Sequence, residues 1–356
     1  MIRHGLHILG LAKGILLLAA LLIFVAGGGS GELIAMLESR FENWKVFLYL
    51  FYWILVLFGG LLLTYPLALI QDHLAHANQN HHEELGTFYW VKGLLGEIFI
   101  GAIILGLFSG VMVFLPSLWW LVLSLVWVGY QGLQPVMEKI MFKSHAETRE
   151  SLPELLADLK PRLEAIGIKT VDAHPLDEDD VPSIERDVIL LSRGPETSVY
   201  VPREWTHDWD HDEIASVVLH KAWTGRSASH MRDVLIHAVS ATFCLGGFML
   251  LYPLAAKLLS LHEPHVLTVA TVLAAWLIPA MFVFRICVHP LYRKWMYEAD
   301  DFVVAQMGTA QPLISVLNRA SDMAPADADV PDWAEILFFG TPSLRRRIAR
   351  QNKSHT

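Results

Sequence analysis

Charged side chains are scarce in this chain: Asp, Glu, Lys and Arg make up 18% of its 356 residues, whereas a soluble domain carries about 25%. Hydrophobic residues make up 54%, and the net charge is −9. The acidic excess leaves no basic face that could neutralise a phosphate backbone. This composition predicts a polytopic membrane protein and excludes nucleic acid as a partner.

Cysteine is almost absent as well. Cys244 and Cys287 are the only two, and both lie in or beside apolar segments. A cysteine in such a place usually acts as a small hydrophobe, so the pair indicates no disulfide framework. The chain also lacks internal repeats and low-complexity segments, which excludes a repeat architecture.

Long uncharged runs are present instead. Residues 46–70 carry no charge over 25 positions, and a helix needs roughly 20 to cross the hydrocarbon core. Residues 98–137 give 40 more uncharged positions, and Pro116 within them predicts two antiparallel spans folded at the proline. Two further spans are predicted at 234–256 and 266–284, joined by a short polar turn.

The N-terminal run, residues 5–26, allows two interpretations. Its basic residues, apolar stretch and following Gly27–Ser30 segment resemble a secretory signal with a small-residue cleavage site. With the Lys13 side chain reaching toward the interface, however, the run is long enough to span a membrane. We interpret it as a span, which brings the predicted total to six transmembrane helices.

Basic residues predict the orientation. Lys and Arg gather at the N-terminus, in 139–232 and after Phe284, and cytoplasmic loops are enriched in both. We therefore expect an inner or plasma membrane protein whose termini and soluble portion are cytoplasmic, although the loop 71–90, also placed inside, lacks basic residues. The predicted domains are a four-span region at 1–137, a soluble insert at 138–231, a membrane hairpin at 232–288 and a helical tail at 289–356.

The sequence of the insert between spans four and five predicts a small α/β unit. A helix is expected to begin near Ser151 and to end at Gly167. Residues 187–192 and 197–201 predict a short hairpin, and 212–224 predict a second helix. Three short helical stretches are expected in the tail.

Three segments resemble one known family. Residues 212–224 (DEIASVVLHKAWT) are similar to the metal-binding helix of the CAAX prenyl protease (Ste24/HtpX-like) family, membrane zinc metallopeptidases that carry His-Glu-x-x-His at this point. Residues 293–302 resemble the segment with the third zinc ligand, a Glu three residues before an Ala-Asp pair. Residues 330–333 and 340–344 resemble an Asp-Trp and a Ser-His-Pro-Pro-Leu stretch. Order and spacing agree from about 46 to 350, which implies a zincin-like soluble domain and helices around a chamber, typically with seven spans.

The residues that carry zinc chemistry in that family are replaced in this chain. A zincin helix needs His at i and i+4, a Glu between them as general base and a distant carboxylate as third ligand. His220 matches the first His, but the resemblance places Lys221 at the base and Thr224 at the second His. It also places Met296 at the third ligand and Thr341 at the family's substrate-side His. A protonated lysine takes no proton and repels Zn²⁺, and a hydroxyl or thioether is a poor zinc ligand, so we predict a site without zinc or catalysis.

Two carboxylates near the replaced site raise further hypotheses. Lys221 could supply the missing positive charge by pairing with Asp300 or Glu298, or it could extend to solvent. Glu298 is also a candidate for a surviving ligand. It lies one residue before Ala299 rather than three, and a helix turns about 100° per residue, so its carboxylate should point away from His220.

Other polar groups were candidates for metal binding or interhelical contacts. Two His/Asp tracts carry imidazole and carboxylate ligands, although such tracts are more often solvated loops. These tracts are Asp72, His73, His76, His81 and His82, and residues 207–212. His237 lies inside a predicted span, where a hydrogen-bonded contact between helices is the simpler interpretation. Glu97 lies near a span end, where its side chain can reach the interface.

The leading prediction is a catalytically inactive metallopeptidase homologue that acts by binding another membrane protein or a hydrophobic or lipidated peptide. Its contacts would use small residues on membrane faces, such as Gly101, Gly106 and Gly110. Two alternatives stay open. One is an active membrane zinc protease with ligands drawn from His220, Glu298, His230 or His289. The other is a metal-handling transport protein, which the lack of buried carboxylate pairs in the spans disfavours.

Overall fold

The computed structural model describes residues 2–76, 87–143, 150–176, 188–193, 196–225, 227–262, 264–323 and 330–353. The chain forms two compact units. The first combines Met1–Val128 with His237–Arg285, and the second combines Gly129–Ile236 with Ile286–Thr356. Each unit is therefore assembled from two separate stretches of sequence.

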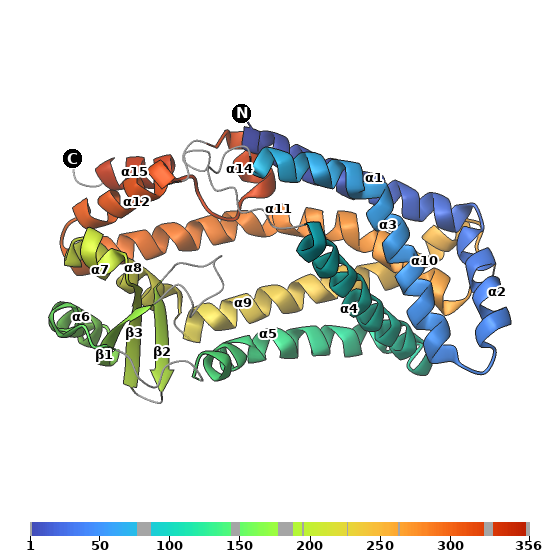
Figure 1. Ribbon diagram of the computed structural model, residues 1–356, viewed down its shortest axis with the longest axis horizontal. Coiled ribbons are helices and arrows are strands. Elements are labelled where there is room, and N and C mark those ends of the chain that lie inside the picture. The colour runs from blue at the N-terminus through green and yellow to red at the C-terminus, as the bar shows by residue number, and fades with distance from the viewer. Residues whose placement is uncertain are drawn as a thin grey trace. The chain divides into compact units, whose positions relative to one another are not determined.

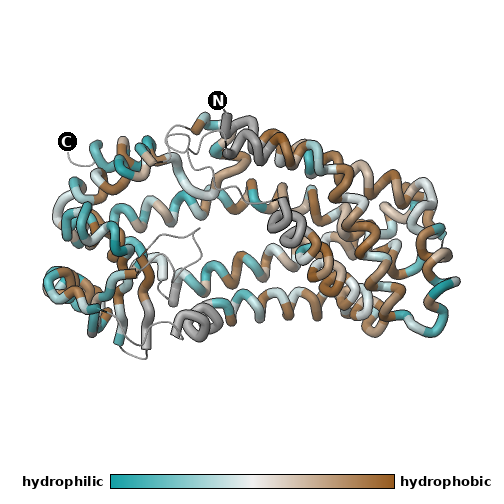
Figure 2. The backbone as a smooth tube through the Cα atoms, viewed as in Figure 1, coloured by the Kyte–Doolittle hydropathy of each residue, from teal (hydrophilic) through white to brown (hydrophobic). Residues whose placement is uncertain are grey.

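The first unit is helical and apolar. Its helices are α1 (Ile2–Ala26), α2 (Gly29–Phe41), α3 (Lys45–His76), α4 (Thr87–Phe114), the start of α5 (Trp119–Lys143), the end of α9 (Ser227–Ala241), α10 (Gly247–Leu258) and the start of α11 (Val266–Met307). Figure 2 shows hydrophobic residues concentrated along α3, α4 and α10.

Five helices in the described residues are long and apolar enough to cross a membrane. They are Ile8–Ala26, Lys45–Ile70, Leu95–Phe114, Ser229–Leu258 and Val266–Met307. They match five of the predicted spans, and the chain is an integral membrane protein by this criterion. Helix α5 occupies the position of the remaining span, and the count of six stays a prediction.

The proline in the long uncharged run divides two helices, as expected. Helix α4 ends at Phe114, and α5 begins at Trp119. The small residues of α4 serve a different purpose from the one predicted. A Cβ at Gly101 would lie 3.2 Å from Leu57 Cδ1 of α3, and one at Gly106 would lie 4.0 Å from Tyr49 Cβ. These two glycines therefore pack against α3 of the same chain, whereas Gly110 faces open space.

Helix α2 was not predicted, because the glycine-rich sequence at its start resembles a linker. Gly28 precedes it with a φ of 81°, which a glycine adopts without a Cβ clash. A buried hydroxyl network then fixes the helix. The Ser30 Oγ lies 2.8 Å from the Tyr52 hydroxyl and 2.9 Å from Thr268 Oγ1, and the Tyr52 hydroxyl lies 2.7 Å from Thr271 Oγ1. These contacts join α2 to α3 and α11 where water is excluded.

One predicted span is not a regular α-helix. Between α9 and α10 lies η2, a single π-helical turn at Thr242–Gly246. The Trp276 indole nitrogen of α11 donates a hydrogen bond of 2.7 Å to the Cys244 carbonyl within that turn. Trp276 therefore satisfies a carbonyl in the irregular segment.

The second unit contains the predicted α/β insert and the C-terminal helices. Its sheet has the order β1-β3-β2, formed by β1 (Lys169–Leu176), β2 (Ile189–Arg193) and β3 (Glu196–Pro202). Strand β2 pairs antiparallel to β3 as the predicted hairpin, whereas β1 pairs parallel to β3 and was missed. The helices, labelled in Figure 1, are α6 (Pro153–Ala165), α7 (Trp205–Asp208), α8 (His211–Thr224), α12 (Gln311–Met323), α14 (Asp332–Phe338) and α15 (Leu344–Lys353).

The core of this unit holds α8 in place. Fully buried Ile214, Val218 and Leu219 of α8 pack in one cluster with β3, α6, α12 and the end of α11. Glu213 fixes the start of the helix, because its carboxylate accepts hydrogen bonds from the Asp210 backbone N–H at 3.2 Å and from the Ser315 hydroxyl. This anchoring sets the face that α8 turns toward α11.

Helix α11 continues well beyond the predicted span. It has 42 residues, about 63 Å at 1.5 Å per residue, or twice the thickness of a hydrocarbon core. The charged residues from Arg285 onward suggested an end to the span, yet the helix runs on to Met307. Its second half belongs to the α/β unit and carries Met296 and Asp300.

Candidate functional site

Helices α8 and α11 carry the residues that the sequence singled out. His220 lies on the α8 face that meets α11, and its Nε2 is 3.5 Å from Oδ1 of Asp300. That distance is long for a hydrogen bond, and Nε2 is buried without a hydrogen-bond partner among the described residues. The imidazole therefore packs beside the carboxylate without a well-formed bond to it.

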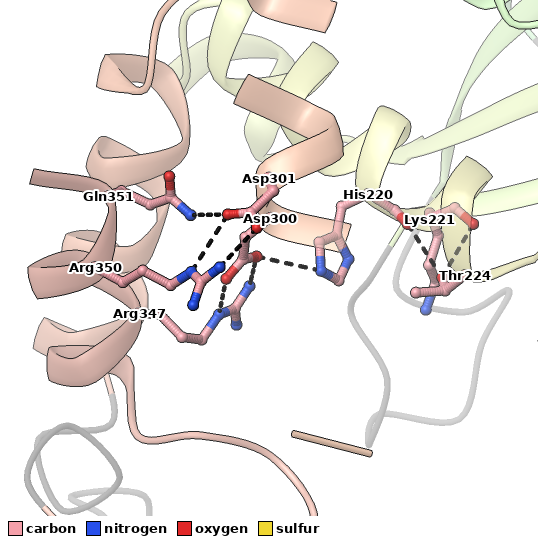
Figure 3. Close-up of polar contacts among 8 residues, drawn as sticks. All are labelled: His220, Lys221, Thr224, Asp300, Asp301, Arg347, Arg350 and Gln351. Atoms are coloured by element: carbon pink, nitrogen blue, oxygen red, sulfur yellow. Dashed lines mark hydrogen bonds and ion pairs between the residues drawn. The ribbon is translucent and has the colours of Figure 1, made fainter. Parts of the chain in front are cut away.

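Asp300 is fully buried, and an arginine neutralises it. Arg347 of α15 donates from Nη2 to Oδ1 at 2.6 Å and from Nε to Oδ2 at 2.9 Å. Figure 3 shows this fork closing on one side of Asp300 while His220 lies on the other. One turn further along α15, Arg350 makes a similar pair with the neighbouring Asp301, at 2.8 Å and with both side chains half-exposed. The two arginines therefore hold α15 against α11.

This geometry corrects the hypothesis for Lys221. The described partners of Asp300 are Arg347 and His220, and those of Glu298 are Arg232 at 3.8 Å and Lys294 at 3.9 Å. Figure 3 places the Lys221 side chain beside Thr224, on the far side of His220 from Asp300. The cation that balances the buried carboxylate thus comes from α15, because a side chain one residue after His220 projects about 100° away around the helix.

Three of the replaced positions come together in a pocket of about 330 Å³. Thr224, Met296 and Thr341 all line it, although they come from α8, α11 and the loop before α15. The rest of the lining is mostly aromatic and consists of Trp223, Ser229, Arg232, Asp233, Tyr292, Trp295, Phe338, Phe339 and Gly340. The structure therefore brings together three residues that the sequence resemblance places at a metal centre, and their side chains are two hydroxyls and a thioether.

These side chains do not fit a zinc ion. The Thr224 hydroxyl donates to the backbone carbonyls of His220 at 3.2 Å and Lys221 at 3.1 Å, so its hydrogen is directed into its own helix. Met296 offers a thioether, and His220 turns its Nε2 to Asp300. A zinc centre needs three strong protein ligands around one point. Within the described residues, no group of three or more His, Cys, Asp or Glu side chains could hold a metal ion.

The remaining metal candidates have other surroundings. His211 Nδ1 lies 2.6 Å from Asp158 Oδ2 of α6, and His289 Nδ1 lies 3.4 Å from the Ile336 carbonyl. His230 does not belong to any metal-binding group of the described part of the chain. Residues 72, 73 and 76 belong to helix α3 rather than to a loop, and 81 and 82 lie outside the described residues. The ring of His237 meets the Trp127 indole nearly edge-on, with 6.0 Å between centroids.

Sequence reasoning missed two arginines of this region. Arg347 belongs to the run Arg345–Arg347, and a run of arginines after a motif segment was a signal that an acidic pair such as Asp300–Asp301 needed a partner. Arg232 was counted only as part of a basic stretch. Its guanidinium lies 5.3 Å from the ring centroid of Trp223 and 4.7 Å from that of Trp295.

Comparison with known proteins supports the fold and no more. No protein-family model matches the sequence, and no curated protein sequence matches it. Several solved structures match the fold. One is the crystal structure of S. mikatae Ste24p, with a TM-score of 0.65 and 15% sequence identity over 92% of this chain and 82% of that one.

This match defines the class of protein. The chain is an integral membrane protein with a predominantly helical, Ste24-like fold. The Ste24-like fold is therefore confirmed, at an identity that establishes the fold alone, and the zincin-like soluble domain and the number of spans stay predictions.

Proposed function

We propose that this protein is a catalytically inactive, metallopeptidase-like membrane protein that acts by binding, as a scaffold or accessory subunit. Its partner would be another integral membrane protein or a hydrophobic or lipidated peptide. One observation supports the proposal: Thr224, Met296 and Thr341, which the sequence resemblance assigns to a zinc centre, line one pocket and offer it two hydroxyls and a thioether.

The chemistry of the pocket supports binding over hydrolysis. A zinc peptidase must hold a water molecule on the metal and remove its proton with a nearby base. Lys221 stands at the base position and carries the wrong charge for that role, while His220 is a single imidazole beside Asp300. A pocket with mostly aromatic walls can still hold a ligand without hydrolysing it, which is consistent with a role in binding.

Metal analysis of the purified full-length chain tests the proposal. We expect no stoichiometric zinc after exposure to equimolar ZnCl₂ and no hydrolysis of hydrophobic or prenylated peptides. The variant K221E/T224H/M296E restores the ligand pattern and serves as the positive control, because it should retain about one zinc per chain if the helices keep zincin geometry. Stoichiometric zinc in the unaltered protein, lost on His220→Ala, would refute the proposal.

The partner and the orientation need separate experiments. Cross-linking in intact membranes followed by purification in mild detergent should recover one membrane protein in constant ratio to this chain. Recovery of the chain alone after cross-linking would contradict an accessory role. Protease protection in sealed vesicles tests the predicted cytoplasmic location of the α/β unit, which should be cleaved only from the cytoplasmic side.

A further inference from the structure

The pocket near the replaced zinc positions has an unusual combination of groups. Five aromatic rings line it, together with one cation and one anion that are adjacent in sequence, Arg232 and Asp233. The paired charges give the lining no net charge. Such a pocket favours a ligand that carries both signs of charge over one with a single charge.

Arg232 is held in a position to receive an acceptor. Its guanidinium lies between the indoles of Trp223 and Trp295, and its Nη2 donates to Ser229 Oγ at 2.9 Å. The Nε atom is buried and has no hydrogen-bond partner among the described residues. Glu298 is 3.8 Å from Nη1, which leaves the Nε side without a described acceptor. The Arg232 side chain as a whole is 33% exposed, and a phosphate oxygen is a strong acceptor for arginine N–H groups.

The aromatic walls suit the opposite charge. Faces of Trp, Tyr and Phe attract ammonium groups, and aromatic cages bind choline-like cations. The Asp233 carboxylate lies in the same lining and adds an anion for an ammonium to approach. At about 330 Å³, the pocket is within the range of small-molecule sites and large enough for a headgroup.

The sequence places these residues where lipid headgroups are found. Arg232 and Asp233 directly precede the apolar stretch 234–256, and Tyr292–Met296 follow the apolar stretch 266–284 by two to three helical turns. Tryptophan, tyrosine and arginine are typical of the interface just outside the hydrocarbon core. The pocket therefore begins at the membrane interface with Arg232 and Asp233 and extends past it to Tyr292–Met296, about 12–18 Å beyond their apolar stretch.

We propose that this pocket binds the zwitterionic headgroup of a membrane phospholipid. The phosphate accepts a hydrogen bond from the Arg232 guanidinium, and the ammonium lies against the aromatic rings and Asp233. The inference rests on the proposed function, because a zinc centre at Thr224 and Met296 would fill the same space. An inactive pocket occupied by lipid would be sensitive to membrane composition.

Lipid binding by the full-length protein tests the inference. Native mass spectrometry from detergent micelles would compare phosphatidylcholine, phosphatidylethanolamine and phosphatidylglycerol with identical acyl chains. We expect at least one zwitterionic lipid to bind about tenfold more tightly than phosphatidylglycerol, because only the zwitterionic headgroups carry the ammonium, and a tenfold difference is the size of one ammonium–aromatic contact. Equal binding of all three would overturn the inference. Tighter binding of free glycerophosphocholine than of the lipid would also overturn the inference, because it would assign the pocket to a soluble metabolite.

Variants locate the binding in the pocket. Arg232→Met should weaken the binding of all three lipids, because each carries the phosphate that the guanidinium contacts, and Asp233→Asn should reduce the difference between zwitterionic and anionic lipids. Arg285→Met is the matched control, since Arg285 is exposed at the end of an apolar stretch and does not line the pocket, so it should leave both the binding and the preference unchanged. If Arg232→Met does not fold, Thr341→Trp fills the pocket from an exposed position and should displace the lipid.

The same preparations separate the two proposals. Zinc-free protein without peptidase activity that shows no headgroup preference would overturn the lipid inference and leave the proposed function standing. Stoichiometric zinc with peptide hydrolysis would overturn the proposed function, whatever lipid is bound.

Discussion

Replacing Arg347 by methionine should destabilise the α/β unit strongly. Asp300 is fully buried, and Arg347 provides two hydrogen bonds of 2.6 and 2.9 Å from a side chain that is 13% exposed. Without the guanidinium, an ionised carboxylate would remain in a dry environment with only His220 near it. Breaking a buried ion pair from one side costs about 3–5 kcal/mol, and we expect a loss of that size in the free energy of unfolding.

Denaturant unfolding of the full chain in micelles, followed by tryptophan fluorescence, measures the loss. The matched control is Arg350→Met, one turn along the same helix, because the Arg350–Asp301 pair is half-exposed. Removing that pair should cost about 0.2–1 kcal/mol. The double variant D300N/R347M removes the buried charge as well and should recover on the order of 2 kcal/mol relative to R347M.

Two outcomes would refute this reasoning. One is a loss for R347M as small as that for Arg350→Met, which would mean that Asp300 is not held as a buried anion. The other is a double variant as unstable as R347M, which would assign the loss to packing of the arginine stem rather than to the unpaired charge.

Three further variants probe other contacts. Tyr52→Phe removes the hydroxyl that joins α2, α3 and α11 and should lower the free energy of unfolding by about 1 kcal/mol. Tyr252→Phe is its control and should be neutral or stabilising, because the Tyr252 hydroxyl is buried without a partner in the described structure. Glu213→Ala loses the hydrogen bonds to the α8 N-terminus and to α12, and it should lower the free energy of unfolding by about 2–4 kcal/mol. Asp212→Ala removes only an exposed pair, so an equally small loss for Glu213→Ala would contradict the anchoring role of Glu213. Gly28→Ala forces a Cβ into a left-handed conformation and should lower the midpoint of thermal unfolding by the equivalent of about 1 kcal/mol, so an unchanged midpoint would show that α2 does not need this conformation.

The apolar helices and the hairpin could be predicted because each depends on local pattern. Uncharged runs longer than a bilayer is thick mark spans without any knowledge of their neighbours. The β2–β3 hairpin follows from two short strand patterns separated by a turn, and α8 follows from its cap and apolar stripe. Thr224, Met296 and Thr341, which are distant in sequence, line one pocket, and their assignment to a former zinc site stays a prediction.

The features that were missed depend on tertiary contacts or weak local signals. Strand β1 contains Asp172, His174 and Pro175, so its sequence has no strand pattern, and its parallel pairing to β3 specifies it instead. Helix α2 begins in glycines that look like a linker. The Asp300–Arg347 pair joins residues 47 positions apart, and no local pattern identifies such a partner.

The π-helical turn at Thr242–Gly246 has a consequence for how the chain tolerates deletions. A π-turn behaves as an α-helix with one extra residue, so removing a single residue there would let α9 and α10 join as an unbroken α-helix. Each residue taken from a helix rotates everything beyond it by about 100°, but here the bulge would absorb the change. The Trp276 indole would then lose the Cys244 carbonyl as its acceptor. A one-residue deletion scan across 234–256 should therefore show its mildest effect at this turn, which contains one residue more than an α-helix needs.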